Sequence, residues 1–133
     1  MSARVSDAAD AGPGRRALLA VLLGGMVGTA LRLGVAEAVP PLWATLAVNL
    51  VGALFLGLLH ERLCEHRIGR SATWSALGPG LCGALTTFSA LQLEAVELAR
   101  DGAWKGALLY LAASLCLGLP AAALGRRLGR AGA

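Results

Sequence analysis

Two polar residues in the first half of the sequence stand inside long apolar stretches. Arg32 follows a segment rich in small residues, and Asn49 is flanked by Val48 and Leu50. A charge within a membrane span is costly, so Arg32 either extends to the nearer interface or has a function at depth. Asn49 can both donate and accept hydrogen bonds. It can therefore contact a passing ion or, as is commoner for such a residue, link two helices.

Three hydroxyl residues surround an aromatic residue in the third apolar stretch: Thr86, Thr87, Phe88 and Ser89. In an unbroken helix, the hydroxyl groups would bond back to carbonyls of the preceding turn. Beside a helix break, they can line a conduit. The edge of a phenylalanine ring is electropositive and attracts anions, although most such rings in a span contact only lipid or other side chains. The cluster therefore indicates an ion path on condition that the helix is broken near it.

Further polar residues follow toward the C-terminus. Gln92, Glu94 and Glu97 belong to one predicted helix, in which Glu94 lies deeper than Glu97. Tyr110 and Ser114 are four positions apart, so they share one face of the next helix. Such a stripe can belong to an ion path, although a Tyr–Ser pair more often serves packing.

Enzymatic and nucleic-acid functions find little support. The sequence has no HExxH, GxSxG or P-loop motif, and Cys64, Cys82 and Cys116 form no CxxC pair. The net charge of +4 and the pI of about 9.6 would suit a nucleic-acid partner. However, the basic residues stand in short clusters between apolar runs, as interfacial arginines do in membrane proteins.

Four apolar stretches must position these side chains. The chain has 133 residues, 56% of them hydrophobic and 15% charged, whereas soluble domains carry about 25% charged residues. A hydrocarbon core of about 30 Å requires about 20 helical residues. The sequence thus predicts an all-α integral membrane protein with transmembrane helices over residues 17–39, 42–63, 73–98 and 103–124. The disordered tail 1–16 precedes this four-helix domain (17–125), and the basic tail 126–133 follows it.

The third predicted span contains residues that weaken a helix. Gly78, Pro79 and Gly80 stand near its start, and Gly83 follows before the hydroxyl cluster. Irregular backbone at membrane depth is tolerated where it lines a cavity or is buried in protein, so this span is a candidate broken helix with an ion site. Alternatively, these residues only mark the start of the span and allow close helix packing.

Taken together, the motifs resemble the Fluc (CrcB) family of fluoride channels over residues 24–125. The similar segments are GGMVGTALR at 24–32, TLAVNLVG at 45–52 and GLCGALTTFS at 80–89, followed by Tyr110 and Ser114. Each motif is modest alone, but four in the same order at matching spacing form a specific pattern.

The resemblance implies an antiparallel dimer that conducts fluoride passively out of the cell and so lowers its toxic cytoplasmic concentration. It also implies a structural Na⁺, not transported, held by backbone carbonyls of Gly83 and Thr86. Arg32 would stand near an entrance. The residues that would line the fluoride path are Asn49, Phe88, Thr87, Ser89, Glu94, Tyr110 and Ser114.

Two positions depart from the family pattern. Leu91 stands where the family often has a second phenylalanine, and Gly118 stands where some members carry a hydroxyl. Two other functions compete with a channel. A small multidrug exporter would need a deeply embedded carboxylate in the first span, whereas Glu37 is near its end; a scaffold protein would not require polar groups at membrane depth.

Charge asymmetry predicts the orientation in the cytoplasmic membrane. An even number of spans places both termini on one side, together with the loop between the second and third spans. That side carries nine arginines: Arg4, Arg15, Arg16, Arg62, Arg67, Arg70, Arg126, Arg127 and Arg130. The opposite side carries Arg100 and Lys105. The bias places both termini in the cytoplasm and favours a heterodimer with a homologous chain of opposite bias; the alternative is a dual-topology homodimer.

Overall fold

The computed structural model describes residues 14–64 and 71–131, and all regular elements in these ranges are helical. The predicted N-terminal tail and the second loop therefore fall mostly outside the described residues. The elements in chain order are α1 (Arg15–Ala38), α2 (Pro41–Leu59), the π-helical η1 (His60–Cys64), α3 (Ala72–Ser75), the π-helical η2 (Ala76–Cys82), α4 (Gly83–Leu85), α5 (Phe88–Arg100) and α6 (Trp104–Ala131).

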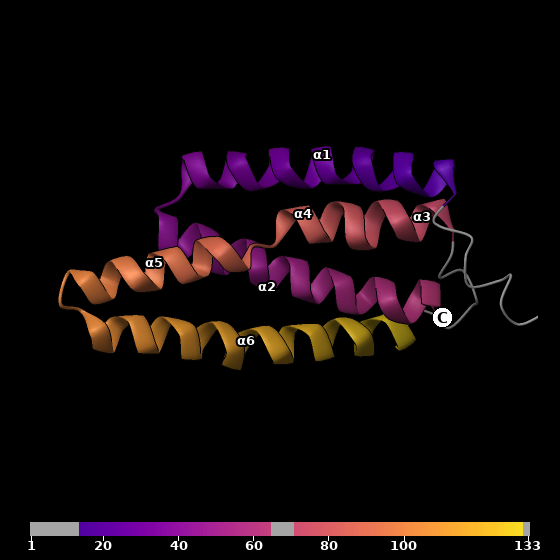
Figure 1. Ribbon diagram of the computed structural model, residues 1–133. Helices are drawn as coiled ribbons and strands as arrows, with labels where there is room; N and C mark the ends of the chain where they lie inside the picture. The colour runs from indigo at the N-terminus through magenta and orange to yellow at the C-terminus, as the bar shows by residue number, and fades with distance from the viewer. Residues whose placement is uncertain (1–13, 65–70, 132–133) are drawn as a thin grey trace, which may run out of the picture.

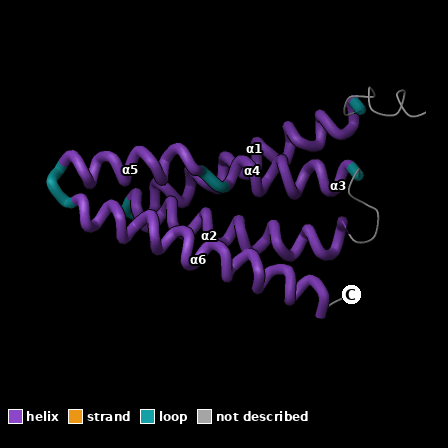
Figure 2. Tube along the Cα trace, turned by 60° about the horizontal axis from the view of Figure 1, so that its bottom comes forward, coloured by secondary structure: helices purple, strands orange, loops and turns teal. Residues whose placement is uncertain are grey.

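The helices lie side by side in an elongated bundle (Figures 1 and 2). The turns that join α1 to α2 and α5 to α6 lie at one end, which we call the turn end. The start of α1, the start of α3 and the end of α6 lie at the other (Figure 1). We call this second end the arginine end, because it carries Arg15, Arg16, Arg62, Arg126, Arg127 and Arg130.

Three segments are long and apolar enough to cross a membrane: Arg15–Ala38, Pro41–Leu63 and Trp104–Ala131. They correspond to the first, second and fourth predicted spans, with ends shifted by a few residues. Their large apolar side chains are widely exposed; Leu23, for example, is 61% exposed. In a bilayer these faces contact lipid, so lipid rather than another protein surface shields them from water.

The third predicted span is not one continuous helix. The segments α3, η2 and α4 follow one another without interruption, and Pro79 is accommodated within the π-helical η2. Proline cannot donate to the α-helical ladder, and a π-type segment adds the residue that relieves its clash with the preceding turn. The break comes later, at Thr86 and Thr87, whose backbones are extended before α5 begins at Phe88.

Glycines set the distance between α1 and η2. A Cβ atom added at Gly24 would collide with the backbone of Ala76, and one at Gly28 with the backbone of Leu81. Only glycine, whose side chain is a single hydrogen atom, permits such close contact between two backbones. The first-span motif therefore holds the interrupted segment tightly against α1, upstream of the break.

Helix α6 continues to Ala131, so residues 126–131, predicted as a tail, are helical. Glu61 of η1 is only 4% exposed and pairs with both Arg126 and Arg130 of α6. Gly125 of α6 packs so closely on α2 that an added Cβ would collide with the backbone of Leu54. These contacts stabilise the last turns of α6, and sequence periodicity did not reveal them.

Candidate functional site

The helix break is held by the side chain of Asn49, which reaches it from α2. The backbone N–H of Thr87 donates to Asn49 Oδ1 at 2.8 Å, and Asn49 Nδ2 donates to the Thr87 carbonyl at 3.0 Å. In an unbroken helix the Thr87 N–H would instead donate to the carbonyl of Gly83. Asn49 therefore links two helices and also maintains the break, and one of its two Nδ2 hydrogens remains for another acceptor.

The C-terminal end of α4 presents backbone carbonyls. Because Asn49 takes the Thr87 N–H, the Gly83 carbonyl loses its helical donor. Thr86 is extended (φ −78°, ψ 152°), and its hydroxyl bonds back to the Cys82 carbonyl at 2.9 Å. A Cβ at Gly83 would meet no atom within 4 Å. Carbonyls at a helix C-terminus that lack a helical donor suit a hard cation.

The N-terminal end of α5 begins at the same break. The Thr87 hydroxyl accepts from the N–H of Ala90 at 3.2 Å and lies 3.4 Å from the Ser89 hydroxyl. A helix N-terminus carries a partial positive charge and favours anions. The Phe88 ring is 69% exposed on the surface of the chain. The hydroxyl residues Thr86, Thr87 and Ser89 are therefore beside a helix break. These residues were predicted to line an ion path only if such a break is present.

A carboxylate joins three helices about two turns beyond the break. Glu94 of α5 accepts from the Tyr110 hydroxyl of α6 at 2.5 Å and from the Thr45 hydroxyl of α2 at 2.7 Å. Thr45 and Tyr110 are 6% and 8% exposed. The structure thus brings together the predicted residues Glu94 and Tyr110. Thr45 was missed, although its position one turn before Asn49 on the same face of α2 was a usable signal.

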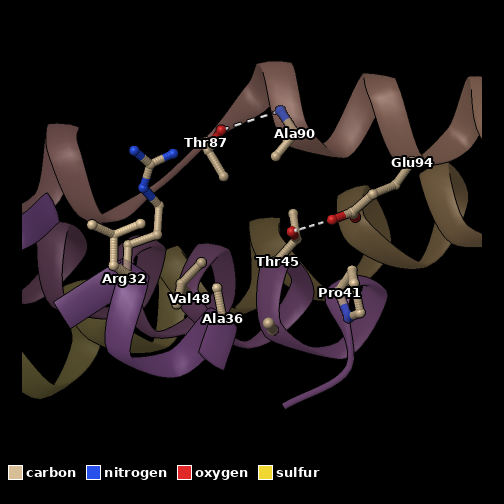
Figure 3. A pocket seen from close by; sticks show the side chains of 10 residues that line it. Arg32, Ala36, Pro41, Thr45, Val48, Thr87, Ala90 and Glu94 are labelled. Carbon is tan, nitrogen blue, oxygen red and sulfur yellow. Dashed lines mark hydrogen bonds between the residues drawn. The ribbon is translucent and has the colours of Figure 1, made fainter. Parts of the chain in front are cut away.

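Arg32 lies beside a cavity of about 230 Å³ between α1, α2 and α5 (Figure 3). The cavity is also lined by Thr45, Thr87 and Glu94. Arg32 Nε is buried and has no hydrogen-bond partner among the described residues. Figure 3 shows the guanidinium near Thr87 and the Glu94 carboxylate at the Thr45 side. The cavity therefore has an unsatisfied cationic donor at one end and a hydrogen-bonded carboxylate at the other.

Other predicted residues are placed differently. The Ser114 hydroxyl donates to the Tyr110 carbonyl at 2.8 Å, so it is directed to its own helix. Leu91 is buried in an apolar cluster with Ala95 and Ala107. A Cβ at Gly118 would meet no atom within 4 Å, so packing within this chain does not require glycine there. The described residues contain no group of three or more His, Cys, Asp or Glu side chains that could hold a metal.

The chain is similar to known proteins over most of its length. The sequence model of the family described as "CrcB-like protein, Camphor Resistance (CrcB)" matches residues 19–126. The chain is 40% identical over 109 residues to the fluoride-specific ion channel FluC 1 of Mycobacterium bovis, covering 78% of this chain and 83% of that protein. It is 38% identical over 121 residues to the fluoride-specific ion channel FluC of Stutzerimonas stutzeri, covering 86% of this chain and 98% of that protein. The chain therefore belongs to the CrcB family of membrane channel proteins.

Proposed function

We propose that this chain is a subunit of a fluoride-specific channel that exports fluoride passively across the cytoplasmic membrane. The observation that carries the proposal is the cavity beside the helix break, where the buried Nε of Arg32 has no partner among the described residues. A small anion in the cavity would be attracted by the positive guanidinium group of Arg32, which lines it. The relatives named fluoride-specific ion channels support the choice of fluoride.

The path would begin at Arg32, which attracts the anion and offers a charged donor. The hydroxyls of Thr87 and Ser89, with the remaining Nδ2 hydrogen of Asn49, would then replace part of its water shell. Fluoride is small and strongly hydrated, so a track of closely spaced donors is needed to compensate for its lost water. The exposed edge of Phe88 would add an electropositive contact.

Farther along, Thr45 and Tyr110 would extend the track. Both hydroxyls donate to Glu94, so an arriving anion competes with the carboxylate for the same hydrogens. Transfer of these donors between Glu94 and fluoride lets the site hold the ion without trapping it. Ser114 would take part only after its hydroxyl leaves the Tyr110 carbonyl.

A structural Na⁺, which is not transported, would bind the carbonyls of Gly83 and Thr86. The absent helical donor of Gly83 supports this assignment. A cation there would offset the negative C-terminal end of α4. Replacing Na⁺ by a bulky organic cation should lower both dimer stability and fluoride efflux. Full activity without Na⁺ would exclude the site.

We further propose four membrane crossings, of which the third comprises α3, η2, α4 and α5, and assembly as an antiparallel dimer. A broken helix cannot face lipid unless its irregular backbone is covered. An apolar groove of about 610 Å³ runs along α5 and α6 beside Phe88, and a second subunit would cover it.

The orientation follows from the arginine end. An excess of arginine remains in the cytoplasm, so both termini would be cytoplasmic. If every copy of this chain inserts in the same orientation, two copies cannot form an antiparallel dimer. The partner would then be a homologous chain with the opposite charge bias. Hydrogen fluoride that enters the cell dissociates inside and releases fluoride. The negative interior potential would then drive this anion out through the dimer.

Fluoride efflux from liposomes that contain the purified chain tests the function, with the chain alone and together with a CrcB homologue of opposite charge bias. Arg32→Gln provides a variant in the path, and Lys105→Gln a charge-matched control at the turn end. Efflux that requires the homologue supports the heterodimer, and efflux by the chain alone supports the homodimer. Absence of fluoride efflux in both preparations would refute the channel.

A further inference from the structure

The arginine end carries a strong excess of positive charge. Its six arginines are all exposed, and the only acidic residue at this end among the described residues is Glu61, which is buried. The turn end is different, because Glu37, Glu97 and Asp101 there accompany Arg100 and Lys105. The excess is therefore confined to one end of the bundle.

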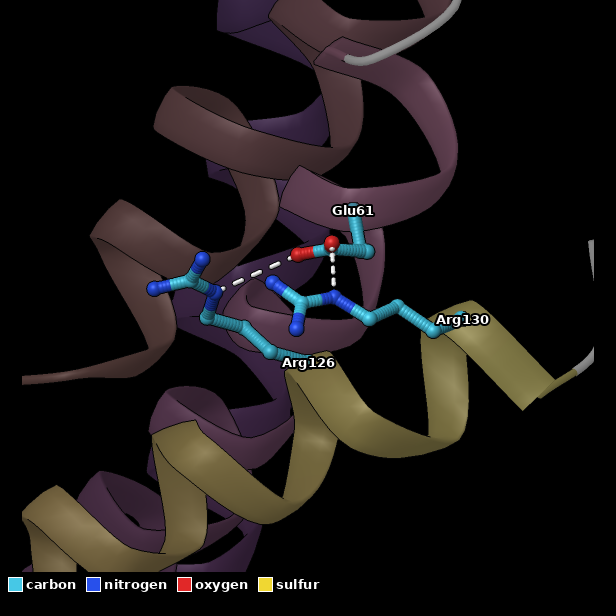
Figure 4. A network of polar contacts seen from close by, with 3 residues as sticks. All are labelled: Glu61, Arg126 and Arg130. Carbon is cyan, nitrogen blue, oxygen red and sulfur yellow. Dashed lines mark hydrogen bonds and ion pairs between the residues drawn. The ribbon is translucent and has the colours of Figure 1, made fainter.

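Glu61 fixes the position of two of these arginines (Figure 4). Arg126 Nε lies 3.2 Å from one carboxylate oxygen, and Arg130 Nε pairs with the other. The two arginine side chains remain 53% and 58% exposed. One carboxylate offsets only one of the two charges, so the triad keeps a net positive charge. Because both side chains are already ordered, binding of a further anion costs less conformational entropy.

The triad lies at the depth of lipid headgroups. Lys105 and Arg126 are 21 positions apart in α6, which corresponds to about 32 Å along a helix. The hydrocarbon core of a bilayer is about 30 Å thick. When Lys105 is at one interface, Arg126 therefore reaches the other, where phosphate groups are found.

Apolar side chains accompany the arginines on α6. Leu124 and Leu128 are 49% and 47% exposed and share one helix face at a spacing of four residues. Arg127 is three positions after Leu124, so it is next to the same face. A ligand bound by Arg127 therefore meets a guanidinium group and a hydrocarbon surface, which favours a phospholipid over a free anion.

We propose that Arg126, Arg127 and Arg130 form a binding site for the headgroup of an anionic phospholipid, with Glu61 as the anchor that positions the outer two. The headgroup phosphate accepts hydrogen bonds from the guanidinium groups, and an acyl chain packs on Leu124 and Leu128. The site is independent of which ion the chain conducts.

Native mass spectrometry of the protein in mild detergent tests the proposal, with equal amounts of phosphatidylglycerol and phosphatidylcholine of the same acyl chains. Phosphatidylglycerol should be retained over phosphatidylcholine by about tenfold or more, because its headgroup has a net negative charge, whereas the choline cation of phosphatidylcholine balances the phosphate. Equal retention of the two lipids would overturn the site.

Variants locate the binding. Arg126→Gln and Arg127→Gln should each lower the preference several-fold, whereas Arg100→Gln removes the same charge at the turn end and should preserve it. Arg127 forms no ion pair within the described part of the chain, so its replacement leaves the anchor intact. Unchanged preference in both variants would overturn the proposal. Displacement of phosphatidylglycerol by millimolar inorganic phosphate would overturn the choice of a lipid.

Discussion

The helix break and the arginine end each contain a charged side chain with buried polar atoms, and the two side chains have opposite surroundings. At the arginine end, both oxygens of Glu61 are paired with arginines of α6. Near the break, the buried Nε of Arg32 has no partner in the described part of the chain. Glu61 joins η1 to α6, whereas Arg32 faces a cavity of about 230 Å³.

This difference separates structural from functional use of a buried charge. A paired carboxylate contributes to the position of α6, and its charge is already compensated by the arginines. An unpaired donor is costly to bury, and we propose that a ligand in the adjacent cavity offsets this cost. Changes near the break should therefore affect conduction, and changes at Glu61 should affect stability.

The largest effect is expected for Asn49→Leu, which keeps the volume and removes both hydrogen bonds to Thr87. Two lost bonds and an unsatisfied backbone amide should lower fluoride efflux by about 100-fold. Fluoride efflux from liposomes measures this loss, and a thermal unfolding curve checks that the variant is folded. Thr86→Val is the matched control, because it removes a neighbouring hydroxyl that bonds back to Cys82. Equal losses in the two variants would contradict the special role of Asn49.

Arg32→Gln should lower efflux by about 30-fold at low salt, and the loss should shrink at high salt because salt screens the attraction of Arg32 for an anion approaching from solution. Its unfolding midpoint should not fall, since the variant removes an unpaired donor. Efflux measured at two ionic strengths, together with a thermal melt, checks both expectations. A destabilised variant with normal efflux would reverse the roles assigned to Arg32 and Glu61.

Phe88→Ile should lower efflux by about tenfold, because isoleucine keeps the bulk and lacks an electropositive ring edge. The ring is 69% exposed in the single chain, so folding should be preserved. Leu93→Ala, at another exposed apolar position of α5, provides the control. If Phe88→Ile conducts like the parent, the ring edge does not contact the anion.

Glu61→Gln should change efflux by less than about twofold, because Glu61 contacts the end of α6 and no residue of the cavity. It should lower the thermal unfolding midpoint by several degrees, since two arginines lose their charged partner. Thermal melts and efflux assays on the same preparation compare the two properties. A large loss of efflux with normal stability would place the arginine end on the conduction path.

Several contacts at the site were beyond prediction from sequence. The Thr45–Glu94 hydrogen bond joins residues 49 positions apart, and the pairs of Glu61 with Arg126 and Arg130 join residues 65 and 69 positions apart. Periodicity places residues on helix faces but does not state which faces meet. The glycine contacts of α1 with η2 and of α2 with α6 determine which helix faces pack together.

By itself, the sequence determined the membrane class, the family and three of the four predicted spans as long apolar helices. Hydropathy and motif spacing are local properties, and the bilayer makes them decisive because it leaves few ways to satisfy a backbone. The tertiary structure alone decided that the break falls at Thr86 and Thr87 rather than at Pro79, and that Asn49 maintains it. The physical reason is that two acceptors compete for the N–H of Thr87: the Gly83 carbonyl of its own helix and the side chain of Asn49 from α2. The hydrogen bond to Asn49 forms, and it depends on how the two helices pack.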